Sequence, residues 1–315
     1  RNKGVEIGLT GTPFLTSNFS WNMGLNLSFN DNRVEQLAPG LDQLLHTDYD
    51  GNAAQLVSKV GQPMGDFLAH PVAVNGKGEK IVDPNGLYKV DPTRMEKIGN
   101  AMPKVIGGLS NSFNYKGFSL DVVMDFRYGG YIMPTAINWM LSRGLLEESL
   151  NFMDKAHGGI SYYEGPDGRV RTDAAQGPNG EMVYDNGIIL EGVKIDGKPN
   201  DYIVSNPEYY NTVYNWGGPQ YSPNTRYELY IQKNSYIKMR EITFGYDLPR
   251  NLVSKIGAKK LQLSVFGRNL FYVYRTLKDL DAEQTTAGSR WEQTLTNVGT
   301  NPSTRSFGVM LRASF

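Results

Sequence analysis

Segment 18–30 constrains the fold more than any other part of this 315-residue chain. Apolar side chains alternate along it, without a break, with small or polar ones. A period of two residues places the two sets on opposite faces of a β-strand. The apolar set has aromatic residues near both ends (Phe19, Trp21 and Phe29) and aliphatic residues between them, as in the lipid-facing stripe of a membrane barrel strand. The segment therefore predicts a strand with one apolar face.

Similar alternation recurs through the rest of the chain and predicts seven strands in all. In the segment around residue 240 the apolar set changes phase between Met239 and Ile242, so we expect a β-bulge near Arg240 and Glu241. The expected strands lie near residues 4–12, 18–30, 104–115, 118–128, 235–247, 261–274 and 303–315.

The segment 303–315 carries Phe307, Val309, Leu311 and Phe315 on one face. A strand that ends on a phenylalanine carboxylate is unusual for a soluble domain, whose ends tend to be polar. The outer-membrane barrel needs such a closing strand, and we expect these four residues to act as a barrel assembly signal. Taken alone, this segment also fits the last strand of a β-sandwich.

The connections between the expected strands are short after the first, third and fifth strands and long after the second, fourth and sixth. Outer-membrane barrels have short periplasmic turns and long extracellular loops, so this segregation favours a barrel over a sandwich. The long connections, 35–102, 129–234 and 275–302, are then extracellular. The first reads as irregular, with a short strand at 67–74, and the second opens with an amphipathic helix over 135–155.

Composition and motifs exclude several classes of function. The net charge is zero, which argues against a nucleic-acid partner. Without cysteine there is no thiolate metal site, and His46, His70 and His157 lack ligand-like spacing. Asp48 and Asp50 resemble the start of a calcium loop but lack the downstream glutamate. No nucleophile or phosphate-binding motif occurs, so we expect no enzyme activity, no metal and no cofactor.

Several motifs resemble those of SusC/RagA-type TonB-dependent transporters of the Bacteroidota. Asn234–Pro249, with the sequence NSYIKMREITFGYDLP, resembles the signature near the C-terminus of that family. It is followed in the expected order by Gly267–Phe271 (GRNLF), Leu280–Glu283 (LDAE) and Arg305–Phe315. Upstream, Pro103–Gly130 resembles the family's paired strands and Asn2–Val5 an earlier strand start. The resemblance covers nearly the whole chain.

The resemblance implies an all-β fold, the C-terminal part of an antiparallel transmembrane barrel of about 22 strands with a plug in its lumen. Residues 1–315 would be the C-terminal third of that barrel domain, with the plug and the N-terminal strands absent. The implied function is import of a large nutrient, an oligosaccharide or a peptide, across the outer membrane. Implied partners are a SusD-like lid lipoprotein, the TonB complex, the barrel assembly machinery and outer-membrane lipid. The alternatives are a structural or secretion-associated barrel and a secreted carbohydrate-binding β-sandwich.

Two groups of residues are candidates for function. Aromatic residues late in the second long loop could stack on a solute at the mouth of the barrel, or pack the loop against itself or against the lid, and we favour packing. Charged residues on the polar faces of the strands would face the lumen, where we expect plug contact in preference to lining the solute route. The aromatic candidates are Tyr209, Tyr210, Trp216 and Tyr221, and the lumen candidates are Asp121, Asp125, Arg127 and Arg268.

Overall fold

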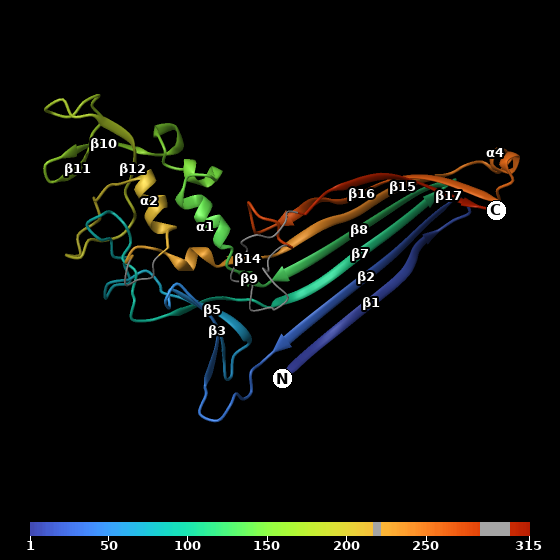
Figure 1. Cartoon of the computed structure of the whole chain (residues 1–315), viewed down its shortest axis with the longest axis horizontal. Coiled ribbons are helices and arrows are strands. Elements are labelled where there is room, and N and C mark those ends of the chain that lie inside the picture. Colours follow the sequence, from blue (N-terminus) through green and yellow to red (C-terminus); the bar gives the residue numbers. More distant parts are fainter. Residues whose placement is uncertain (217–221, 284–302) are drawn as a thin grey trace.

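The computed structural model describes residues 1–216, 222–283 and 303–315. A long β-sheet forms one end of the molecule, and two folded loops form a second part at the other end, which we call the loop module (Figure 1). The loop module comprises the described residues of 33–102 and 130–234. Among the described residues, no helix is long and apolar enough to cross a membrane.

The sheet has seven strands, and each is antiparallel to its neighbour. Its strands in spatial order are β1 (Asn2–Leu15), β2 (Phe19–Asn32), β7 (Pro103–Tyr115), β8 (Phe118–Gly129), β15 (Tyr236–Asp247), β16 (Lys260–Arg275) and β17 (Ser306–Ser314). All-β architecture is thereby confirmed. The remaining described sheets are small and belong to the loop module, so the β-sandwich alternative, which needs two large packed sheets, is wrong.

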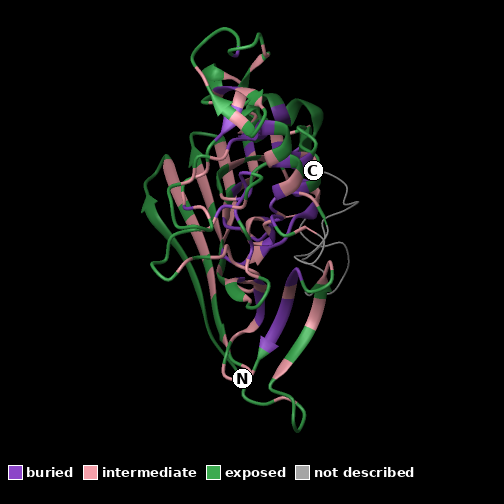
Figure 2. Ribbon diagram, turned by 90° about the vertical axis from the view of Figure 1, so that its left-hand side faces the viewer, coloured by how far each residue is buried: buried purple, intermediate pink, exposed green. Residues whose placement is uncertain are grey.

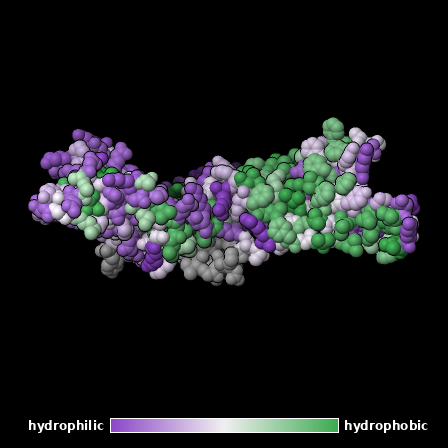
Figure 3. Space-filling model, turned by 90° about the horizontal axis from the view of Figure 1, so that it is seen from above, coloured by the Kyte–Doolittle hydropathy of each residue, from purple (hydrophilic) through white to green (hydrophobic). Residues whose placement is uncertain are grey.

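Strand register places most apolar residues of the seven strands on one side of the sheet, the apolar face. One row, for example, runs from Leu25 through Leu109, Met124 and Met239 to Phe271. No charged side chain belongs to this face between Val5 and Phe29 at one end and the short turns at the other, within the described strands. Hydrophobic residues accordingly gather over the sheet in Figure 3 and hydrophilic ones over the loop module.

The polar set forms the opposite side, the polar face, and the predicted bulge keeps the two faces separate. The pairing of β15 with β8 shifts between Met239 and Glu241, so the bulge expected near Arg240 is confirmed. Met239 pairs with Met124 on one side of the bulge, and Ile242 pairs with Val122 on the other. The extra residue therefore corrects the change of phase that the sequence shows.

Short turns join the strands at the end away from the loop module. Lys116 (φ 47°) and Gly117 (φ 88°) form a two-residue turn between β7 and β8, and two positive φ values in succession are the geometry that matches strand twist. A short helix α4 (Arg250–Val253) and a 3₁₀ turn (Ser254–Ile256) lie between β15 and β16.

The first long loop is more ordered than its sequence suggests. It folds into a four-stranded antiparallel sheet of β3 (Gln43–Tyr49), β4 (Ala54–Lys59), β5 (Met64–Ala69) and β6 (Glu96–Asn100). The expectation of an irregular loop with one strand at 67–74 is therefore wrong. Ala54, Leu56, Val57 and Ser58 in β4 are all buried, and a strand buried on both faces shows no alternation.

The second long loop begins with a helix shorter than the predicted 135–155. Helix α1 spans Thr135–Ser142, and Gly144, with φ 68°, follows its end. Two 3₁₀ turns follow at Glu147–Leu150 and Lys155–His157. The rest consists of a four-stranded sheet, one helix, a 3₁₀ turn and a two-stranded pair: β10 (Ile160–Gly165), β11 (Gly168–Arg171), β12 (Val183–Ile188), β13 (Val204–Ser205), α2 (Asn206–Val213), η3 (Tyr227–Tyr230), and β9 (Tyr131–Ile132) with β14 (Gln232–Lys233).

The main hydrophobic core lies in the loop module and not in the sheet (Figure 2). Phe67, Leu56, Ile132, Met133 and Tyr230 are among its largest fully buried side chains. Every residue of β1, in contrast, is exposed. The two parts of the chain thus differ: the module buries its apolar side chains against itself, whereas the sheet leaves them exposed on one face.

Candidate functional site

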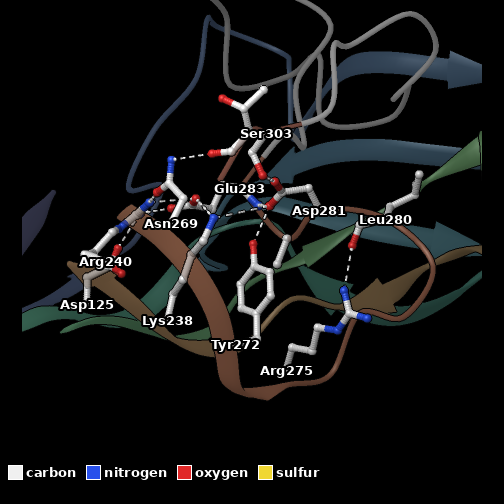
Figure 4. A network of polar contacts seen from close by, with 12 residues as sticks. Asp125, Lys238, Arg240, Asn269, Tyr272, Arg275, Leu280, Asp281, Glu283 and Ser303 are labelled. Atoms are coloured by element: carbon white, nitrogen blue, oxygen red, sulfur yellow. Dashed lines mark hydrogen bonds and ion pairs between the residues drawn. The ribbon is translucent and has the colours of Figure 1, made fainter. Parts of the chain in front are cut away.

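A network of charged side chains occupies the polar face near its loop-side end (Figure 4). Lys238 and Arg240 come from β15, Asp125 from neighbouring β8, and Asp281 and Glu283 from the segment that follows β16. The Lys238 ammonium donates to Glu283 Oε2 at 2.5 Å and lies 3.9 Å from Asp281 Oδ1. Arg240 donates to Asp125 Oδ2 at 2.6 Å and to Glu283 Oε2 at 2.7 Å.

Burial makes this network a structural constraint. The Lys238 side chain is 2% exposed, so its charge lacks water and depends on the two carboxylates. The ammonium also lies 4.8 Å from the centroid of the Tyr272 ring, an added attraction. Bulge residue Arg240 points onto the same face, where it bridges β8 and Glu283.

The network holds residues 277–283 against the polar face of the sheet. Leu277 is 0% exposed and Ala282 is 1% exposed. The amide of Asn234 donates to the Ala282 carbonyl at 2.8 Å, and the Tyr272 hydroxyl donates to Asp281. Sequence reasoning included Lys238, Arg240 and Glu283 only in segments of family resemblance, and Arg240 also at the expected bulge, but did not group them into a site. The available signal was the two cations, Lys238 and Arg240, outside the apolar set of one strand.

The four lumen candidates lie on the polar face. Asp121, Asp125 and Arg127 alternate along β8 opposite the apolar set, and Arg268 lies on β16. Arg268 Nε donates to Glu241 Oε2 at 2.7 Å, and Arg127 donates to the Ala101 carbonyl at 3.3 Å. Only Asp125 of the four joins the charged network. The structure thus brings these residues to one face without bringing them into one site.

A shallow hollow of about 500 Å³ lies on the sheet around Asp121. Small and hydroxyl-bearing residues line most of it, among them Thr10, Ser110 and Ser112. Gly24 belongs to the same wall, and a Cβ there would lie 2.7 Å from Ser110 Oγ. Apart from Asp121, the charged groups of the described strands do not line the hollow, which is otherwise neutral and polar. Such a lining suits contact with a polar surface.

The aromatic candidates divide between the core and the surface of the loop module. Tyr210 is 5% exposed, and its ring stacks on Tyr214 at 5.8 Å and meets Tyr209 edge-on at 5.2 Å. The Tyr210 hydroxyl donates to the Glu148 carbonyl at 2.6 Å. Burial raises the pKa of Tyr210 to about 12, so the hydroxyl stays a neutral donor. These contacts are the packing of the loop against itself. Tyr221 lies outside the described residues.

Trp216 is the described candidate with the most accessible ring, at 45% exposed. It meets Trp139 of α1 edge-on, with centroids 6.2 Å apart, and Trp139 is 47% exposed. The Arg143 guanidinium lies 3.1 Å above the Trp139 ring. Two indoles and a cation therefore form an exposed aromatic surface that the sequence pattern did not group.

Phe307, Val309, Leu311 and Phe315 at the C-terminal strand are 75%, 69%, 64% and 74% exposed. Val309 pairs with Val265 and Leu311 with Leu263, so the first three continue the apolar face to the sheet edge.

The histidines each have a local partner. His46 Nε2 lies 2.7 Å from Ser58 Oγ, His70 Nδ1 lies 2.7 Å from the Arg94 carbonyl, and His157 Nδ1 lies 2.8 Å from Asp154. Within the described ranges, no three His, Asp or Glu side chains form a group that could hold a metal ion.

No protein-family model matches the chain, but curated relatives and solved structures do. TonB-dependent receptor P3 of Formosa agariphila is 21% identical over 339 residues, covering 100% of this chain and 28% of that protein. TonB-dependent receptor SusC of Bacteroides thetaiotaomicron is 24% identical over 145 residues, covering 42% of this chain and 14% of that protein.

Solved structures also match over the entire chain. The RagAB peptide transporter has a TM-score of 0.56 at 15% identity, and the chain covers 29% of it. The RagAB peptide importer in its open-open state has a TM-score of 0.55 at 17% identity, with 28% covered. The resemblance to SusC/RagA-type transporters is confirmed, and the fold is that of a portion of such barrels. The chain spans less than a third of the length of these relatives, which are receptors and transporters, not enzymes.

Proposed function

We propose that this chain forms part of the wall of a TonB-dependent importer in the bacterial outer membrane, which takes up a large nutrient, an oligosaccharide or a peptide. The observation that carries the proposal is the seven-stranded antiparallel sheet with a charge-free apolar face. The matches to TonB-dependent receptors support it.

Exposure of the apolar face supports a lipid environment. Val5, Leu9, Val265, Val309 and Leu311 are between 52% and 69% exposed. Covering apolar surface contributes about 25 cal/mol per Å², and soluble proteins rarely leave a patch of this extent uncovered. Aromatic residues lie at both ends of the face, with Phe29 and Tyr128 toward the loops and Trp21 and Phe118 toward the short turns. That distribution matches the interfacial girdles of outer-membrane barrels.

The edges of the sheet support a closed barrel. β1 and β17 have no outer neighbour among the described strands. In lipid each unsatisfied backbone group costs several kcal/mol, so further strands must continue the sheet on both sides. We infer that residues 1–315 belong to one barrel domain of about 22 strands, completed by strands and a plug outside this chain.

The arrangement of the connections supports an orientation in the membrane. The loop module and residues 275–302 follow strands that point toward one end of the sheet, and the short turns lie at the other end (Figure 1). We therefore place the module outside the cell and the short turns in the periplasm. Residues Asp121, Asp125, Arg127 and Arg268 then face the lumen and its plug.

The exposed aromatic surface supports the proposed solute contact. Among Tyr209, Tyr210, Trp216 and Tyr221, the described ring most available for stacking on a sugar or peptide is Trp216, beside Trp139. Proposed partners are a SusD-like lid lipoprotein above the module, the TonB complex through the plug, and outer-membrane lipid. Phe307, Val309, Leu311 and Phe315 would be read by the barrel assembly machinery.

The proposal is tested by deleting the full-length gene and measuring uptake of labelled oligosaccharides and peptides by whole cells, with and without a functional TonB complex. In wild-type cells we expect the protein in the outer-membrane fraction. Both the deletion strain and the strain without a functional TonB complex should lose uptake of one class of solute. Normal uptake of every solute by the deletion strain, together with a defect in surface architecture or secretion, would favour the structural or secretion-associated barrel instead.

A further inference from the structure

A pocket of about 430 Å³ lies at the loop-side end of the sheet, outside the charged network and the exposed aromatic surface. We call it the rim pocket and define it by Asp31, Lys97, Lys104, Tyr128, Tyr131 and Lys233, which all line it. It is built where β2 and β8 end and β7 begins, beside the β9 and β14 pair.

The rim pocket opens where the apolar face ends. Tyr128 is the last aromatic residue of that face on β8, pairs with Val105, and is 55% exposed. Lys104 immediately precedes Val105, and its side chain is exposed. The Lys233 ammonium lies 4.9 Å from the centroid of the Tyr128 ring. Two cations thus stand directly beyond a band that carries no charge.

The chain leaves the sheet at the same level. Gly129 (φ 79°) and Gly130 (φ 83°) follow Tyr128, and two successive positive φ values turn the backbone away from the strand direction. A Cβ on Gly129 would lie 3.3 Å from the Lys104 backbone nitrogen and 3.4 Å from Lys104 Cγ. The glycine therefore leaves room for the Lys104 stem in the pocket wall.

The charges of the rim pocket are unevenly matched. Lys97 pairs with the buried carboxylate of Asp66 at 2.7 Å. Lys104 and Lys233 form no ion pair with any residue that the structure describes. Asp31 also lines the pocket. Apart from the Lys97–Asp66 pair, the two ammonium groups of Lys104 and Lys233 thus stand against the single carboxylate of Asp31, and the lining keeps a net positive charge that attracts an anion.

We propose that the rim pocket binds the phosphate of an outer-leaflet lipid, with Lys104 and Lys233 on the phosphate and the acyl chains along the apolar face at Tyr128 and Phe29. The inference rests on the proposed function, because it requires the apolar face to lie in the membrane. A lipid phosphate sits at the boundary between acyl chains and water, where these lysines are held, and lysine binds phosphate as a compact point charge. Tyrosine at the same depth anchors the interface.

The test uses full-length protein purified from outer membranes in detergent. The protein is titrated with phosphatidic acid, or with diacylglycerol of the same acyl chains, and native mass spectrometry detects the bound lipid. We expect the wild type to bind phosphatidic acid in preference to diacylglycerol. Lys104→Gln and Lys233→Gln should each weaken phosphatidic acid binding about fivefold, and the double variant about thirtyfold. The matched control is Lys77→Gln with Lys89→Gln, two lysines of the first long loop that do not line the pocket.

Three results would overturn the inference. In the first, the Lys104/Lys233 double variant binds phosphatidic acid as tightly as the control variant. Equal binding of diacylglycerol by the wild type is another, because the phosphate would then be irrelevant. Displacement of the lipid by excess inorganic phosphate, together with loss of preference for the acylated form, would assign the pocket to free phosphate. If the protein sorts to the outer membrane and takes up its solute in any of these cases, only the lipid inference fails and the proposed function stands.

Discussion

The loop module buries its apolar side chains, whereas the sheet presents its own on an exposed face. In the module Phe67, Tyr230 and Ile132 are buried by neighbouring protein. In the sheet Leu9, Val265 and Phe307 face outward and are 53%, 52% and 75% exposed. The packing of a module side chain therefore depends on the shape of its protein neighbours, whereas an exposed side chain on the apolar face is much less constrained by neighbouring protein. The two parts should differ in what they tolerate.

The largest effect should follow from Phe67→Ala in the module. The ring is fully buried, so its removal leaves a cavity and should destabilise the module by about 3–5 kcal/mol. Hydrogen exchange of residues 54–69 and protease cleavage on whole cells would measure the loss. Phe271→Ala on the apolar face is the control, because lipid can fill the space that an exposed ring leaves. A variant at Phe67 that also removes the barrel from the outer membrane would contradict the independence of the two parts.

A charge on the apolar face should have the next largest effect. Met124→Lys places an ammonium in the middle of the face, at a cost of about 2–4 kcal/mol if that side meets the bilayer core. Ser112→Lys, on the polar face beside Asp121, should cost little. Urea unfolding of the full-length barrel in vesicles compares the two. Equal effects of the two lysines would mean that neither face meets lipid.

The same contrast explains what the sequence could predict. The strands of the sheet have one apolar and one polar face, so each carries a period of two that places it within a few residues of its observed bounds. β4 (Ala54–Lys59) is buried on both faces and leaves no such pattern. The alternation of apolar and polar residues along β8 is enough to predict that Asp125 and Arg127 lie on the polar face. The contact of Lys238 with Glu283 joins residues 45 positions apart, and no local pattern encodes it.

Tyr210 and Trp216 show a second limit of the sequence. Both stand in one aromatic-rich stretch, yet Tyr210 is 5% exposed and Trp216 is 45% exposed. Which ring enters the core depends on the partners Tyr214 and Trp139, which are brought there by α2 and α1. Composition of the stretch therefore predicts an aromatic cluster but not which members reach solvent.

A third prediction tests whether the polar face, unlike the apolar one, contains a buried electrostatic constraint. Glu283→Leu leaves the ammonium of Lys238 with Asp281 at 3.9 Å as its remaining anion, and should loosen residues 277–283 by about 3 kcal/mol. The double variant Lys238→Met with Glu283→Leu should recover most of this loss, because the buried ammonium is removed together with its carboxylate partner. Hydrogen exchange of 277–283 is the measurement. Equal loosening in the single and double variants would show that Lys238 does not need the pair.

The smallest effect concerns the surface of the module, where burial is partial. Hydrogen bonds from Arg169, with further ones from Ser205, lower the pKa of Glu208 from its ordinary 4.5 to about 2. A depressed pKa in the folded state adds stability above pH 4.5, and this contribution is lost as the pH falls toward 2. The Glu208 side chain is 52% exposed, so solvent screening limits the contribution to about 1 kcal/mol at most. Glu208→Gln should therefore weaken the start of α2 at pH 7 and leave it unchanged near pH 2.

Hydrogen exchange of residues 204–213 at several pH values checks this prediction, with Glu181→Gln as the matched control. Glu181 is an exposed carboxylate of the same loop whose pKa is also lowered, by hydrogen bonds from Asn179, but it lies outside any helix. Its substitution should leave α2 unchanged at every pH. A destabilisation by Glu208→Gln that persists undiminished near pH 2 would mean that the carboxylate charge is irrelevant. The capping geometry at Ser205 alone would then position α2, and the module would depend on shape even at its surface.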